Sequence, residues 1–280
     1  MRWRGERESG EIEDRRGLGI PGGGFTLSGG GILLILALSL ITGRNPLDFI
    51  QILQQPSSSI DEPQQGKIGA PSDEGGRFVS VVLASTEDVW TRKLAARGIE
   101  YRKPTLVLFD DAVQSACGTA SSAVGQFYCP LDQHVYLDLG FFTELQQRFG
   151  APGEFARAYV VAHEVGHHVQ TLLGITEKVE DARRGLSPEE GNALSVRVEL
   201  QADCFAGVWG HEATNLLEPG DVESGLAAAK AIGDDTLQRR AQGHVVPETW
   251  THGSSEMRVR WLRRGLDSGD VGQCDTFAAR

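Results

Sequence analysis

The chain has 280 residues, of which 40% are hydrophobic, so it can bury a substantial core in one large domain or two small ones. Its formal net charge of −11 argues against a surface that binds phosphate groups, and nucleic acid is not an expected partner. The four cysteines form no Cys-x-x-Cys pair, which excludes zinc-finger and thioredoxin-type sites.

Residues 1–24 are expected to form an unpacked cytoplasmic tail, because Met1 to Arg16 mixes arginines with acids and shows no apolar periodicity. Residues 25–43 predict one transmembrane anchor, since this stretch carries no charge and contains the dense apolar run Ile32 to Leu38. A cleaved signal peptide and a buried helix are the alternatives, although Ser39 to Gly43 offers no clean cleavage site of small residues.

The arginines around this segment predict its orientation. Five arginines precede it, whereas only Arg44 follows closely, which places the tail in the cytoplasm and the body outside. An extracytoplasmic body would also allow paired cysteines to persist as disulfides. Residues 44–76 are rich in Pro, Gln, Ser and Gly and predict a flexible linker, and residues 77–280 are of the size of one domain. We therefore expect a single-pass membrane protein.

The order of the predicted elements in residues 77–280, with a small sheet first and helices later, indicates an α+β fold. Apolar runs and turn residues predict strands at Phe78–Leu83, Pro104–Phe109, Gln126–Cys129 and His134–Asp138, a helix at about Thr86–Arg97 and a turn at Pro130–Gln133. The sequence after Gly150 is expected to be helical.

A helix that begins near Phe155 and stops at Gly174 carries the sequence His163-Glu164-Val165-Gly166-His167. The spacing of four places both imidazoles on one face, one turn apart, where they can bind one ion. Glu164 can face that ion without binding it and take a proton from a polarised water. A solvated polar face is the alternative, but the flanking residues are apolar, and unpaired polar groups there would be costly.

A second helix should supply the third zinc ligand. Ser187 and Glu190 form a capping box that starts a long helix, on which Glu199 and Asp203 share a face. We assign Glu199 as the ligand and Asp203 as the hydrogen-bond acceptor of a ligand histidine. The alternative is an amphipathic helix with ordinary acids outside, although apolar neighbours surround both carboxylates.

Other polar residues near these motifs are not expected to bind the metal. His168 and Cys204 point away from the metal, at about 100° and 140° around their helices. A donor for the developing oxyanion is expected among His244, His252 and Tyr159, of which His252 is favoured. Capping or packing is the competing role for each of these three.

The cysteines and one strand complete the expectations. We pair Cys117 with Cys129 and Cys204 with Cys274, while the other connectivities stay open. The strand around Val135 to Leu137 is expected to offer a free edge to an extended peptide.

Several motifs together resemble the neutral zinc metallopeptidase family of bacterial membrane-anchored proteins. The resemblance runs nearly end to end and includes Met1-Arg2-Trp3, Glu13 to Gly17, His163 to Gln170, Glu199 to Cys204 and Thr251 to Ser255. It implies a zincin-type fold, Zn²⁺ as cofactor, one N-terminal membrane segment and a peptide or protein substrate. The Glu199-x-x-x-Asp203 spacing also looks like the glutamate-zincin pattern. An inactive zinc-binding envelope scaffold and a zinc hydrolase of a cell-wall amide are the rival readings, and the oligomeric state is open.

Overall fold

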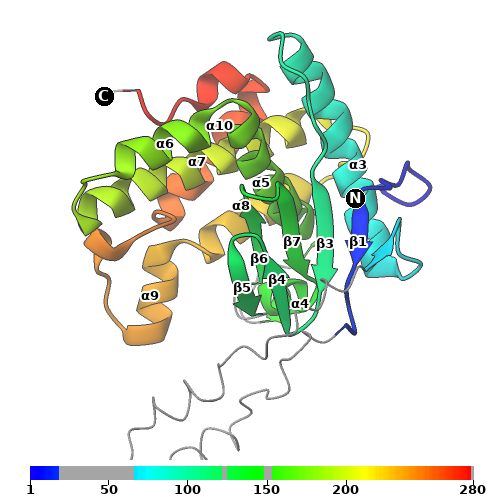
Figure 1. Ribbon diagram of the computed structural model, residues 1–280, viewed down its shortest axis with the longest axis horizontal. Coiled ribbons are helices and arrows are strands. Elements are labelled where there is room, and N and C mark those ends of the chain that lie inside the picture. The colour runs from blue at the N-terminus through cyan, green and yellow to red at the C-terminus, as the bar shows by residue number, and fades with distance from the viewer. Residues whose placement is uncertain (19–65, 122–124, 148–152, 279–280) are drawn as a thin grey trace, which may run out of the picture.

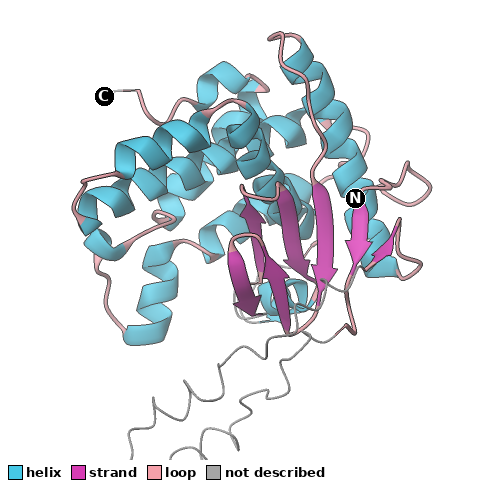
Figure 2. Cartoon of the chain, viewed as in Figure 1, coloured by secondary structure: helices cyan, strands magenta, loops and turns pink. Residues whose placement is uncertain are grey.

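The computed structural model describes residues 1–18, 66–121, 125–147 and 153–278. A mixed sheet has the strand order β2-β1-β3-β7-β6, and a separate hairpin is formed by β4 and β5 (Figures 1 and 2). The strands are β1 (Ile12–Asp14), β2 (Lys67–Ile68), β3 (Thr105–Phe109), β4 (Ala112–Ser115), β5 (Gly118–Ser121), β6 (Gln126–Cys129) and β7 (His134–Asp138). Strands β1, β3 and β7 run parallel, and the edge strands β2 and β6 are antiparallel to their neighbours.

Helices make up most of the remainder, which confirms the mixed α+β class. They are α3 (Glu74–Ala95), α4 (Gly140–Gln147), α5 (Glu154–Leu172), α6 (Ile175–Arg183), α7 (Pro188–Glu212), α8 (Asp221–Ala231), α9 (Asp234–Gln242) and α10 (Ser255–Ser268). Short 3₁₀ helices occupy Pro247–Thr249 and Val271–Cys274. None of the helices within the described ranges is long and apolar enough to cross a bilayer. The anchor expected at residues 25–43 lies outside the described residues.

The two faces of the sheet pack against different layers. Leu106 and Leu108 of β3 belong to the large core that includes α3, α5 and α7, whereas the alternate residues Val107 and Phe109 contact the β4–β5 hairpin around Val113. This alternation follows from the period of two along a strand. Strand β3, in the middle of the sheet, is therefore buried on both faces.

The prediction of an unpacked N-terminal tail is wrong. Ile12 is fully buried, and β1 pairs in parallel with β3 in the middle part of the sheet. Trp3 is 3% exposed and packs edge-on against Phe78 of α3. Trp3 and Ile12 are isolated apolar residues in a polar segment, so they give no periodic signal in the sequence. Both are buried in a core formed mainly by later parts of the chain.

The first strand predicted for the domain is also wrong. Phe78–Leu83 is helical rather than a strand, since it forms part of α3, which Asp73 caps by accepting from the backbone N–H of Gly76. The apolar run is buried in the core, and a short buried run has the same pattern in a helix and in a strand. The predicted linker 44–76 ends in β2 and the first turn of α3, and its part before residue 66 lies outside the described residues.

Other expected elements agree closely with the structure. Strands β6 and β7 have the predicted bounds, β3 differs from its prediction by one residue, and the capping box of Ser187 and Glu190 starts α7. Strand β7 lies between β3 and β6, so the prediction that it has a free edge is wrong. Among the described strands, the edge on this side of the sheet belongs to β6.

Both disulfides have the expected pairing. Cys117 and Cys129 join the turn of the β4–β5 hairpin to the end of β6. Cys204 and Cys274 join α7 to the 3₁₀ helix near the C-terminus. The first bond fixes an edge strand, and the second fixes the helix that carries Glu199.

Candidate metal centre

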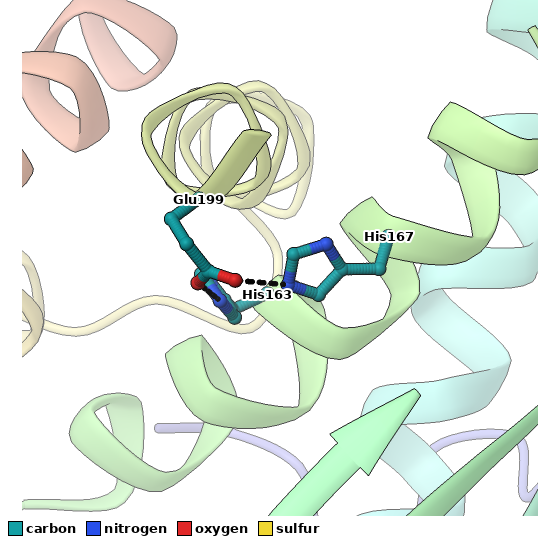
Figure 3. A group of neighbouring side chains, drawn as sticks. All are labelled: His163, His167 and Glu199. Carbon is teal, nitrogen blue, oxygen red and sulfur yellow. Dashed lines mark hydrogen bonds and ion pairs between the residues drawn. The ribbon is translucent and has the colours of Figure 1, made fainter. Parts of the chain in front are cut away.

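Two helices bring the three expected ligands together (Figure 3). His163 and His167 lie on α5 and Glu199 lies on α7, and one ligand atom from each is within 4.8 Å of the other two. Nε2 of His163 is 3.1 Å from Oε2 of Glu199, and Nε2 of His167 is 3.5 Å from Oε1. Both Nε2 atoms therefore face one carboxylate across a space that a cation can occupy.

The protonation of each ring fits a metal at this point. Nδ1 of His163 donates to Oδ1 of Asp203 at 2.9 Å, and Nδ1 of His167 donates to Oε1 of Gln170 at 2.9 Å. With Nδ1 engaged as a donor, the Nε2 lone pair of each neutral ring is free for a metal. Two imidazoles and one carboxylate are the donor set of hydrolytic zinc sites that keep one position open. The residues present fit zinc.

Asp203 lies at the centre of a buried polar cluster. It is fully buried, and besides His163 it accepts two hydrogen bonds from the Arg258 guanidinium at 2.9 Å each and one from the Tyr159 hydroxyl at 2.5 Å. Burial alone would raise the pKa of Asp203, but the charge of Arg258 and the hydrogen bond from His163 lower it to about 2. Asp203 is thus held as a carboxylate that orients His163.

Two of the expected ligands have strongly shifted pKa values. Burial opposes the charged form of His163, but the carboxylates of Asp203 and Glu199 outweigh burial and raise its pKa to about 10. Burial likewise disfavours the ionised form of Glu199, yet the two imidazoles hold its pKa well below the usual value. The site is therefore organised to concentrate negative charge where a cation would bind.

Glu164 lies beside the ligand group and has a different environment. It is 4% exposed and lines the same cleft as both histidines. Burial raises its pKa, although the neighbouring His163 and His167 oppose that shift. A carboxyl group whose pKa is raised is suited to accept a proton and return it.

The three candidate donors to the oxyanion, His252, Tyr159 and His244, lie in different environments. His252 lines the cleft, and its Nδ1 lies 3.4 Å from Oδ1 of Asp234. Tyr159 contributes its hydroxyl to Asp203, and His244 lies exposed with Nδ1 donating to the carbonyl of Gln242. His252 is therefore the candidate of the three that remains available to a substrate.

His168 has the structural place expected from its angle on the helix. It is fully buried, donates through Nε2 to the carbonyl oxygen of Arg102 and accepts at Nδ1 from the Tyr128 hydroxyl. Burial lowers its pKa to about 4, so the ring is neutral at physiological pH. It connects α5 to the edge strand β6.

Three residues of the site were not anticipated from the sequence. Arg258 reaches Asp203 from α10, and Gln170 and Gln201 form hydrogen bonds behind His167. Gln170 follows His167 by three residues, so helical spacing could have indicated it. No local pattern could have indicated Gln201 or Arg258, because their contacts come from helix packing.

A cleft of about 690 Å³ runs over the ligands. Its walls include Phe127 and Tyr128 of β6, Val160 of α5 and Ile232 beside α8. The edge strand and the metal ligands therefore face one open space.

The comparisons with known proteins agree with this site. The family model described as "Putative neutral zinc metallopeptidase" matches residues 1–277. The "Uncharacterized protein YpfJ" of Escherichia coli (strain K12) is 47% identical over 285 residues, covering 99% of each chain, and the "Uncharacterized protein Rv2575" of Mycobacterium tuberculosis (strain H37Rv) is 41% identical over 249 residues, covering 81% of each. No solved structure matches significantly. The chain therefore belongs to the neutral zinc metallopeptidase family.

Proposed function

We propose that the protein is a zinc-dependent peptidase with His163, His167 and Glu199 as metal ligands and Glu164 as general base. The observation that carries the proposal is the buried Glu164 carboxyl beside three converging ligands, because a purely structural metal site needs no base. When bound, zinc supplies a Lewis acid that polarises the substrate carbonyl and acidifies water. Glu164 takes the proton of the attacking water and delivers it to the leaving amine.

His252 is proposed as the donor to the oxyanion that develops on the substrate carbonyl. One carboxylate holds both its backbone and its ring: Oδ2 of Asp234 accepts from the backbone N–H groups of Thr251, His252 and Gly253 at 2.7 to 2.9 Å, and Oδ1 faces the ring. The Thr251 hydroxyl lies 3.0 Å from Nδ1 of His252 and can donate to it, which places the ring proton on Nε2. Nε2 has no partner among the described residues and can donate to the substrate. A donor fixed in advance costs no reorganisation during the reaction.

The edge strand β6 supports a peptide as the substrate. The backbone N–H of Asp138 donates to the carbonyl of Gly125, so Gly125 and, by alternation, Phe127 direct their backbone groups toward β7. Gln126 and Tyr128 then direct theirs toward the open edge, and both line the cleft. An extended peptide can pair with these two residues without selection of its side chains.

An extracytoplasmic location is proposed with this activity. The two disulfides of the fold support it, because disulfides persist in oxidising compartments. We further propose that the apolar residues 25–43 attach the protein to the membrane.

The test uses the full chain in detergent, because residues before and after the apolar segment share one sheet. Metal content is measured by mass spectrometry, and cleavage of casein and of a peptide library is compared between wild type and Glu164→Gln, with the exposed Glu177→Gln as matched control. One zinc per chain in all three proteins, with cleavage lost only in Glu164→Gln, supports the peptidase. Zinc without cleavage in wild type favours the scaffold or a cell-wall amide substrate, and absence of zinc refutes the proposal.

A further inference from the structure

A chain of buried side-chain amides connects the second histidine of the metal site to the C-terminal disulfide. Oε1 of Gln170 accepts from Nδ1 of His167, and Nε2 of Gln170 donates to the carbonyl of Val198 at 2.8 Å and to Oε1 of Gln201 at 3.0 Å. Nε2 of Gln201 then donates to the carbonyl of Cys274 at 3.0 Å. Gln170 is 1% exposed and Gln201 is 5% exposed, so both side-chain amides are largely shielded from bulk water.

The direction of every bond in this chain is fixed by its ends. The carbonyl oxygens of Val198 and Cys274 can only accept, so each glutamine must turn its NH₂ group toward them. Oε1 of Gln170 is then the atom that faces His167, and it can only accept as well. Nδ1 of His167 must therefore carry the proton, which leaves the Nε2 lone pair for a metal.

We call the hydrogen bonds from His167 through Gln170 and Gln201 to Cys274 the relay. Its end at Cys274 depends on a covalent bond. Cys274 lies in the 3₁₀ helix Val271–Cys274, outside the helices that carry the ligands, and its disulfide to Cys204 joins it to α7. Both cysteines are fully buried. The disulfide thus holds the Cys274 carbonyl against Gln201, three residues before Cys204 on the same helix.

We propose that Gln170 and Gln201 are positioning residues that transmit the place of the C-terminal disulfide to His167, so that the Cys204–Cys274 bond supports metal binding. The proposal rests on the zinc site of the proposed function. His163 has a separate support in Asp203 and Arg258, so loss of the relay should weaken the metal site without abolishing it.

The test measures the zinc dissociation constant by chelator competition and the visible spectrum of the Co²⁺-substituted full chain. The double variant Cys204→Ala with Cys274→Ala should bind zinc about tenfold more weakly, which is the loss of affinity expected when the hydrogen-bond partner of a metal ligand is removed. It should also alter the Co²⁺ spectrum. The matched control is Cys117→Ala with Cys129→Ala, which removes the other disulfide and should change neither readout.

A second variant separates the relay from general stability. Gln201→Met keeps the disulfide and the side-chain volume but breaks the amide chain, and it should reproduce the tenfold loss. A variant that combines Gln201→Met with loss of the Cys204–Cys274 disulfide should bind zinc no more weakly than either change alone. Both changes break the same series of hydrogen bonds to His167. Wild-type affinity and spectrum in Gln201→Met overturn the relay alone, whereas a wild-type chain that binds no zinc overturns the proposed function.

Discussion

Gly166 and Ala202 touch where α5 and α7 cross. A Cβ atom on residue 166 would lie 3.0 Å from the carbonyl oxygen and 3.3 Å from the Cβ of Ala202. Residue 166 lies between the two ligand histidines, and Ala202 follows Glu199 by three residues. The absence of a side chain at Gly166 therefore allows the close approach of the two helices that carry the proposed ligands.

Gly166→Val should push α7 away from α5 and spread the ligands. We expect zinc affinity to fall at least about tenfold, because small displacements of a ligand set cost affinity strongly. Chelator competition measures the effect. Gly191→Ala on α7 is the control, since its added methyl meets no atom within 4 Å and should stabilise the helix by about 0.5–1 kcal/mol. Unchanged affinity in Gly166→Val would show that the helix contact does not set the site.

Zinc affinity should increase with pH. The pKa of His163 in the metal-free site is raised to about 10, despite burial, by the carboxylates of Asp203 and Glu199. Below this pKa a proton occupies the ring and competes with the metal, so affinity should rise about tenfold per pH unit between about pH 7 and 9.

The same shift gives the metal-free fold a pH dependence of the opposite sign. A pKa raised from 6.5 to about 10 stabilises the fold below the unfolded value, and this contribution is lost as pH rises through the folded value. Urea unfolding in the presence of a chelator should show a free energy of unfolding that falls as the pH rises from about 6.5 to about 10. Asp203→Asn removes the main partner of the proton, so a slope as steep as that of wild type in this variant would contradict the explanation.

His252→Ala should reduce kcat about 100-fold with KM and zinc content nearly unchanged, because the lost interaction forms in the transition state. Asp234→Asn should produce a smaller loss of kcat, since it weakens the support of the ring and its loop. The exposed His244→Ala serves as the control. Steady-state kinetics on one peptide decide the matter, and an effect confined to KM would assign His252 to substrate binding instead.

Substrate backbone amides should matter more than side chains along β6. Peptides that carry a single N-methyl group at the positions facing Gln126 and Tyr128 should show a higher KM, since they lose one backbone hydrogen bond each. Gln126→Pro should remain folded, because its N–H faces the open edge and takes no part in the β6–β7 ladder. A KM insensitive to every N-methyl position would place the substrate elsewhere in the cleft.

Local patterns in the sequence predicted much of the candidate site. His163 and His167 lie four residues apart on one helix, and Ser187 with Glu190 marks a helix start, so both features depend on neighbours in the chain. Arg258 and Gln201 could not be predicted, because their contacts arise only when α10 and the C-terminal segment pack on α7. The run Phe78–Leu83 favours a strand although it lies in α3, because a short apolar stretch has no distinguishing period.

The place of β1 has a consequence for how the chain is made. Ile12 pairs with Leu106, so the first strand to be synthesised must wait for β3 before it can enter the sheet. Such a long loop closure is slow compared with local helix formation. We therefore expect the N-terminal segment to dock late, and it must reach the same compartment as β3 to do so. A membrane segment between them would have to return the chain to the side from which it came.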